Sequence, residues 1–269
     1  MGILNATPDS FSDGGKFLDP DTATARAEQM LDDGAAIIDI GGESTRPGAE
    51  IVPTEIEIQR VVPIVERLKR RRPDAVISVD TTKPEVAEAA LKAGADILND
   101  VRGAWDQPSE IAGTAAEHGA GLVIMHSRGT PGDMRGLTDY DDIVREVRDA
   151  LSAAAERAIA AGVARESIVL DPGLGFAKNA EGSLELTSRI AEIAETGFPI
   201  LVGHSRKSFI GWMLNPTDPP PPENREWGTA AVTAWLVMRN VDIVRVHDVH
   251  ATKAVVDATS KINRGHVRP

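Results

Sequence analysis

The fold can be read from residues 76–103, VISVDTTKPEVAEAALKAGADILNDVRG, in which two apolar runs flank an alanine-rich stretch. The runs Val76–Thr81 and Ile97–Gly103 have the apolar character of strands that are buried on both faces. The amphipathic stretch between them ends at Gly94, where a left-handed helix cap is needed. Residues 76–103 are therefore predicted to form a strand, a helix and a parallel strand.

The same unit recurs along the whole chain. Eight strands are expected, at Gly2–Ala6, Ala36–Gly42, Val76–Thr81, Ile97–Gly103, Leu122–Ser127, Ile168–Gly173, Pro199–Ser205 and Ile243–Val249. Five helices are expected to end at a glycine just before the next strand, at Gly34, Gly94, Gly119, Gly162 and Gly197. Eight such units fit an α/β fold of the (β/α)8 TIM barrel type. An open doubly wound sheet is the alternative, but it leaves too many strands for one domain of this length.

Helix boundaries are predicted from capping residues. Asp19-Pro20 heads a helix over Thr22–Gly34, and a longer helix is expected over Asp139–Ala161. Thr54-x-x-Glu57 and Thr82-x-x-Glu85 have the pattern of capping boxes for the second and third helices. Residues 215–223, NPTDPPPPE, interrupt the seventh helical region and are predicted to form an exposed loop. No linker is visible, so residues 1–269 are expected to form a single domain.

Composition limits the partners. The 269 residues include 29 Lys plus Arg and 41 Asp plus Glu, a net charge of −12, so nucleic acid and anionic membranes are not expected to bind. The chain has no cysteine, which excludes disulfides, cysteine-based metal sites and thiol nucleophiles. This composition fits a reducing cytoplasm. We expect neither a membrane-spanning segment nor a signal peptide, because the sequence lacks both patterns.

Polar residues collect at the carboxyl ends of the expected strands, where barrels of this type have their active sites. These residues are Asn5, Gly41–Gly48, Asp80, Asn99, Met125, His126, Asp171, Ser205–Lys207, Arg245 and His247. The Asp80 carboxylate is expected to be free for a ligand, since Thr82 and Glu85 would supply the helix cap. Asn99 offers an acceptor and two donors to the edge of a heterocycle, although it could instead cap a loop. Asp171 could likewise be a turn residue.

A second group of residues predicts an anion subsite. Arg245 and His247 lie two positions apart on the eighth expected strand, so both should point to the same face. Ser205-Arg206-Lys207 precede a helix, whose free N–H groups and dipole attract anions. Phosphate sites in such barrels often use the loops after strands seven and eight. Arg206 is expected to form a surface ion pair instead.

Two long segments carry a family resemblance, GILNATPDSFSDGG at 2–15 and DIGGESTRPG at 39–48. They are followed in order by Ser78–Thr81, Asn99–Asp100, Met125–His126, Asp171–Phe176, Gly203–Gly211 and Arg245–Asp248. Over nearly the whole chain, the sequence resembles the dihydropteroate synthase family of pterin-binding enzymes. The resemblance implies a transferase of folate biosynthesis. It would condense 6-hydroxymethyl-7,8-dihydropterin diphosphate with 4-aminobenzoate, giving 7,8-dihydropteroate and diphosphate.

The resemblance also implies roles for individual residues. The catalytic residues would be Asp80, Lys207, Arg245 and His247. The substrate-binding residues would be Phe11, Thr45, Arg46, Pro47, Asp80, Asn99, Met125, Asp171, Phe176, Lys207, Ser208, Arg245 and His247. Asn5 would hold Mg²⁺ together with diphosphate oxygens. Diphosphate would leave first, Asp80 would stabilise the resulting cation, and the amine would then attack. Sulfonamides would compete with 4-aminobenzoate, and the last helices would form a homodimer.

Two alternatives remain open. A pterin-binding barrel that transfers a methyl group to a corrinoid protein would share Asp80, Asn99 and Asp171, but it has no reason to carry Ser205–Lys207. A catalytically silent paralogue would bind pterin or a partner without reaction, and it has no need of the two signature segments. An assay for dihydropteroate formation separates both from a synthase.

Overall fold

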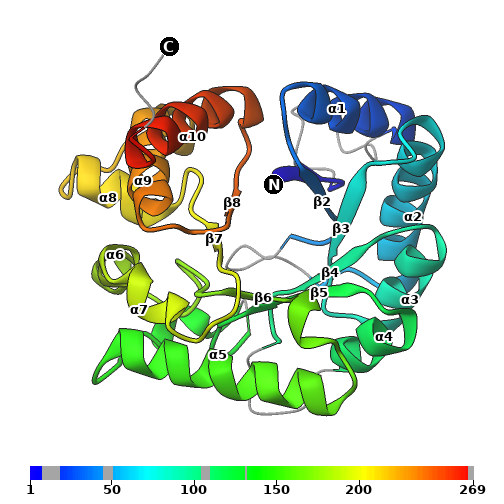
Figure 1. Ribbon diagram of the computed structural model, residues 1–269, viewed down its shortest axis with the longest axis horizontal. Helices are drawn as coiled ribbons and strands as arrows, with labels where there is room; N and C mark the ends of the chain where they lie inside the picture. Colours follow the sequence, from blue (N-terminus) through cyan, green and yellow to red (C-terminus); the bar gives the residue numbers. More distant parts are fainter. Residues whose placement is uncertain (8–18, 45–50, 104–109, 131, 266–269) are drawn as a thin grey trace.

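The computed structural model describes residues 1–7, 19–44, 51–103, 110–130 and 132–265. The strands are β1 (Gly2–Asn5), β2 (Ile37–Gly41), β3 (Val76–Asp80), β4 (Ile97–Asp100), β5 (Gly121–Met125), β6 (Ile168–Asp171), β7 (Leu201–Gly203) and β8 (Ile243–Arg245). The helices are α1 (Pro20–Asp32), α2 (Thr54–Arg71), α3 (Pro84–Lys92), α4 (Glu110–His118), α5 (Ile143–Ala160), α6 (Ala180–Ser188), α7 (Ile190–Ala194), α8 (Ser208–Leu214), α9 (Glu226–Met238) and α10 (Val249–Asn263). Figure 1 shows the strands in the middle of the molecule and the helices around them.

The strands close into a barrel. Parallel pairing runs without interruption from β1 to β6, and β7 pairs in parallel with β8. The two sheets meet on both sides, because Leu170 bridges to Ile200 and Gly2 bridges to Val246. The Ile3 N–H donates to Val246 O at 2.9 Å, and the Leu170 N–H donates to Pro199 O at 2.9 Å. All eight expected strands are therefore present, and the (β/α)8 prediction is confirmed.

Glycines end the helices as the sequence predicts. Gly34, Gly94, Gly119, Gly162 and Gly197 all have positive φ, with values from 63° to 110°. Each follows a helix and precedes a strand, so the chain reverses direction at a residue without a Cβ atom. Residues 215–223 lie between α8 and α9 and are mostly exposed, which confirms the predicted loop.

Both predicted capping boxes are wrong. The residue before α2 is Pro53 and the residue before α3 is Lys83, and neither makes a side-chain cap hydrogen bond. The Glu57 carboxylate is instead buried and accepts a hydrogen bond from Lys83 Nζ. This ion pair satisfies the charge of the buried Glu57, which would cost more to leave unpaired than a capping bond at an exposed helix end contributes. The predicted Asp19 cap is confirmed, since its side chain accepts the Thr22 N–H at 3.0 Å.

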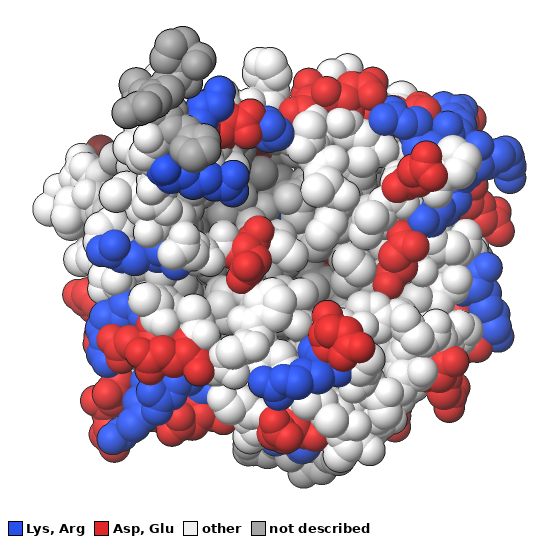
Figure 2. All heavy atoms as spheres, in the orientation of Figure 1, with Lys and Arg blue, Asp and Glu red and all other residues white. Residues whose placement is uncertain are grey.

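The core lies between the strands and the surrounding helices and consists mainly of Ala, Val, Ile and Leu. On the face drawn in Figure 2, charged side chains of both signs lie mostly around the edge, and the middle is mainly uncharged. Within the described part of the chain, no helix combines the length and the apolar character that crossing a membrane requires.

Candidate active site

Asp39 is the centre of a buried hydrogen-bond network inside the barrel. Its Oδ1 accepts from Ser78 Oγ at 2.6 Å, and its Oδ2 accepts from Asn99 Nδ2 at 3.1 Å. Arg245 Nε donates to the same Oδ2 at 2.6 Å. The strand of Arg245, β8, does not adjoin β2, because β1 lies between them. The contact must therefore cross the barrel interior, and these side chains point inward.

Asp80 shares Arg245 with Asp39. Arg245 Nη2 donates to Asp80 Oδ2 at 3.0 Å, while Asp80 Oδ1 is buried and has no hydrogen-bond partner among the described residues. Burial raises the pKa of Asp80 to about 7, although the neighbouring Arg245 opposes this. The expectation that the whole carboxylate is free is thus wrong for one oxygen. The other oxygen remains available to a ligand.

Asp171, Phe176 and Lys207 form the next part of the site. Asp171 Oδ1 accepts the Gly173 N–H at 2.7 Å, as in a turn. Burial raises the pKa of Asp171, and Lys207 and Arg245 are close enough to oppose that shift. Lys207 Nζ lies 4.3 Å from the centre of the Phe176 ring and donates to Leu174 O. Burial lowers the pKa of Lys207 to about 8, with Asp171 opposing the change.

The remaining residues of the predicted anion subsite lie beside β7 and β8. Strand β8 ends at Arg245, so His247 lies beyond the strand and not on it as expected. Both the His247 N–H and its Nδ1 contact Ser205 Oγ, at 3.3 and 3.0 Å. Ser208 is exposed at the first position of α8. Arg206 pairs with Glu226 at 2.6 Å, which confirms the expected surface ion pair.

Met125 and Asn5 complete the described part of the site. Met125 is buried at the end of β5, and Asn5 ends β1. Asn5 and Asp80 both lie close to Gly41. A Cβ atom added to Gly41 would stand 3.9 Å from the Asn5 side-chain oxygen and 3.7 Å from Asp80 Cβ. The predicted residues Phe11, Thr45, Arg46 and Pro47 lie outside the described residues.

Sequence reasoning missed Asp39 as a member of the site. A signal was present, because a carboxylate inside the apolar run Ile37-Ile38-Asp39-Ile40 requires a buried partner. Register places Asp39 opposite Ser78 and Gly41 opposite Asp80. The alternation of a strand therefore puts Asp39 and Asp80 on the same face.

Three comparisons identify relatives of the chain. A family model described as pterin binding enzyme matches residues 1–247. The dihydropteroate synthase of Synechocystis sp. is 52% identical over 251 residues, which are 93% of this chain and 85% of that protein. The chain belongs to the dihydropteroate synthase family. The activity of this family is that of a transferase in folate biosynthesis.

Solved structures of dihydropteroate synthases have the same fold. The enzyme from Clostridium difficile, solved in the presence of pteroic acid, has a TM-score of 0.88 and 44% identity, covering 97% of this chain and 95% of that one. The enzyme from Yersinia pestis, solved with a sulfonamide drug complex, has a TM-score of 0.89 and 40% identity, covering 98% of this chain and 93% of that one. The dihydropteroate synthase barrel is thus matched over nearly its full length.

Proposed function

We propose that this chain condenses 6-hydroxymethyl-7,8-dihydropterin diphosphate with 4-aminobenzoate at the carboxyl end of its barrel. One observation carries the proposal beyond family membership. Asp80, Asp171, Lys207 and Arg245 come from four different strands or the loops after them, yet they lie together. Arg245 donates to Asp80 at 3.0 Å, and a Cβ atom added to Gly203 would stand 3.9 Å from Asp171 Oδ2 and 4.0 Å from Arg245 Cδ. The charge of Asp171 in turn opposes the lowering of the Lys207 pKa. A site with two carboxylates and two cations suits a substrate with hydrogen-bond donors at one end and a diphosphate at the other.

Pterin binding is assigned to Asp171, Asn99 and Lys207. Because Oδ1 of Asp171 is already bonded to Gly173, the second oxygen is assigned to the donors of the pterin ring. Asn99 donates one N–H to Asp39, which fixes the orientation of its amide and leaves its oxygen to accept from the ring. The Phe176 ring and Met125 would supply apolar contact to the pterin.

Cation stabilisation is assigned to Asp80. In the proposed mechanism, diphosphate departs first and leaves positive charge on the pterin methylene. The unpaired Asp80 Oδ1 is a fixed acceptor of negative character in a buried site, where its interaction with a developing cation is strong. Arg245 holds the other oxygen and so fixes the carboxylate. The lone pair of the 4-aminobenzoate amine then forms the C–N bond to the methylene, and the surplus proton of the amine passes to solvent water.

The leaving group is assigned to Arg245, His247 and Lys207. The guanidinium and the ammonium supply positive charge, and the Ser205 hydroxyl fixes the His247 ring. These residues would hold the diphosphate while the bond to the methylene breaks.

Asn5 fits a magnesium ion that is held mainly by substrate. The Asn5 side chain makes no hydrogen bond to another described residue, so its amide oxygen can serve as a metal ligand. No group of three or more His, Cys, Asp or Glu suited to a metal occurs among those residues either. Mg²⁺ commonly uses one or two protein oxygens together with phosphates and water. Bound there, it would neutralise charge on the departing diphosphate.

A homodimer and a cytoplasmic location are part of the proposal. The support for a dimer is a group of exposed apolar side chains on α8, α9 and α10: Met213, Leu214, Trp227, Met238 and Ile262. Isolated apolar residues on a surface are ordinary, whereas a group on neighbouring helices is typical of an interface. The location remains a prediction.

The test is an assay of dihydropteroate formation from the two purified substrates and Mg²⁺. We expect product, and we expect a sulfonamide to raise the KM for 4-aminobenzoate without changing kcat. Lys207→Met should lower kcat/KM at least a hundredfold. Lys69→Met is the matched control, because Lys69 pairs with Asp96 near the amino end of β3 and should leave activity unchanged. Absence of product, or inhibition that 4-aminobenzoate cannot overcome, would overturn the proposal.

A further inference from the structure

Ala177, next to Phe176, has a backbone conformation that is rare for a residue with a side chain. Its φ is 49°, in the left-handed region, and the residue is 1% exposed. Non-glycine residues persist in this region when the surrounding structure fixes them, and they cluster at functional sites. Hydrogen bonds fix the chain on both sides of Ala177. Phe176 O accepts from Lys178 Nζ at 2.8 Å, and Ala177 O accepts from Tyr140 Oη at 3.0 Å.

Lys178 joins this loop to the end of β5. Besides Phe176 O, its Nζ contacts His126 O at 3.2 Å and His126 Nδ1 at 2.9 Å. None of these three partners is a carboxylate, and burial lowers the pKa of Lys178 well below its usual range. The three contacts join the amine to two backbone carbonyls and one ring nitrogen. Lys178 therefore acts as a hydrogen-bonding connector between two strand ends.

Tyr140 is itself held by the segment before α5. The Arg128 guanidinium lies 3.7 Å from the centre of the Tyr140 ring. Arg128 donates to Asp139 O at 2.8 Å and to Glu146 at 2.6 Å. These bonds fix the Tyr140 hydroxyl toward Ala177.

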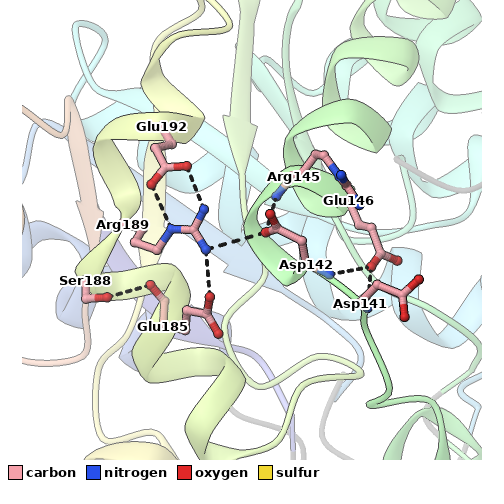
Figure 3. Close-up of polar contacts among 8 residues, drawn as sticks. All are labelled: Asp141, Asp142, Arg145, Glu146, Glu185, Ser188, Arg189 and Glu192. Atoms are coloured by element: carbon pink, nitrogen blue, oxygen red, sulfur yellow. Dashed lines mark hydrogen bonds and ion pairs between the residues drawn. The ribbon is translucent and has the colours of Figure 1, made fainter.

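Figure 3 shows how the start of α5 is fixed in turn. Glu146 accepts the Asp141 and Asp142 N–H groups, at 2.8 and 3.1 Å, and Asp142 caps the helix at Arg145. Arg189, from the junction of α6 and α7, also pairs with Asp142 at 3.5 Å. The support for Tyr140 thus extends to the helices on both sides.

We propose that Lys178 and Tyr140 are positioning residues, which set the Phe176 ring and the Lys207 amine against the pterin. Lys178 bonds the carbonyl of Phe176 and Tyr140 bonds the next carbonyl, while the Phe176 ring contacts the Lys207 amine. Lys207 also donates to Leu174 O in the same loop. A shift of this loop would therefore move an apolar wall and a cation together. The inference rests on the proposed function, because it assigns the loop to pterin binding.

The experiment measures binding of 6-hydroxymethylpterin by calorimetry. Tyr140→Phe removes only the hydroxyl, and Lys178→Met keeps most of the side-chain volume without the amine. We expect at least fivefold weaker binding for each variant. Lys69→Met is the control for loss of a lysine that donates to a backbone carbonyl, here Ala75 O at 2.7 Å. It should bind the pterin as the wild type does.

A double-mutant cycle with Phe176→Leu distinguishes positioning from general destabilisation. Because Tyr140 acts partly through Phe176, the double variant should lose less affinity than the sum of the two single losses. Fully additive losses, or unchanged binding by Tyr140→Phe, would overturn the inference, even if Lys178→Met does not fold. A wild type that binds no pterin would contradict the proposed function itself, so the two failures are distinguishable.

Discussion

One oxygen of Asp171 is bonded to the loop after β6, whereas the other is assigned to the pterin in the proposed function. Asp171→Asn keeps an oxygen for the Gly173 N–H but places a donor where the pterin would also present donors. A buried mismatch of this kind costs about 1–3 kcal/mol. We expect pterin affinity measured by calorimetry to fall at least tenfold, with little change in melting temperature. Unchanged affinity in the folded variant would remove Asp171 from the pterin site.

Asp80 makes the stability of the protein depend on pH. Burial raises the pKa of Asp80 from its ordinary value of 3.8 to about 7, so the folded state retains a proton that the unfolded chain releases. This contribution to stability is complete below pH 3.8 and is lost as the pH rises through about 7. Relative to Asp80→Asn, which does not titrate, the free energy of unfolding of the wild type should therefore decrease over that range. Urea unfolding at a series of pH values measures this difference, and a difference that does not change with pH would contradict the assignment.

At the scale of elements, α6 has a side-chain cap at its amino end, whereas α2 lacks the cap that the sequence predicted. Asn179 accepts the Gly182 N–H at 2.7 Å, whereas Thr54 is the first residue of α2 and makes no cap bond. Asn179→Ala should lower the free energy of unfolding by about 1 kcal/mol, and Thr54→Ala should have little effect. Chemical unfolding of both variants tests this. Equal losses would show that Thr54 does cap its helix.

The strands could be predicted because a strand covered on both faces needs a continuous apolar run, and five of the runs were followed by a helix that ends at a glycine. The ends were less predictable: the segment expected as Ile243–Val249 forms a strand only to Arg245. A capping-box prediction was wrong where a long-range ion pair competes with a local hydrogen bond, as at Glu57. No local pattern shows that Lys83, 26 positions away, takes this carboxylate.

The site was predictable where polar residues end strands, since topology alone brings those ends together. The parts of the site in which a residue's partner lies on the opposite side of the barrel were not predictable. Asp39 meets Arg245 over a separation of 206 residues, and neither local spacing nor charge reveals that pair. The hydrogen bonds of Tyr140 and Lys178 to the loop after β6 depend likewise on how loops pack.

At the scale of the whole molecule, the exposed apolar residues of the last helices predict a dimer. Asn263 donates to Asn240 at 3.5 Å, so the carboxyl ends of α9 and α10, which carry Met238 and Ile262, lie side by side. We expect the wild type to sediment as a dimer and Met238→Asp with Ile262→Asp to sediment as a monomer. Leu137→Asp is the control, because Leu137 is similarly exposed but belongs to the segment before α5. A monomeric wild type, or a double variant that stays dimeric, would contradict this interface.

The contact of Arg245 with Asp39 and Asp80 also orders events during protein synthesis. Asp39 and Asp80 are synthesised early, whereas their cation, Arg245, belongs to β8 and follows them by 206 and 165 residues. The main-chain bonds between Ile3 and Val246 that close the barrel are equally delayed. A nascent chain therefore carries the two acids without their common partner until β8 has been synthesised. The pocket can therefore be completed only after β8 has been made, even if the first six strands pair earlier.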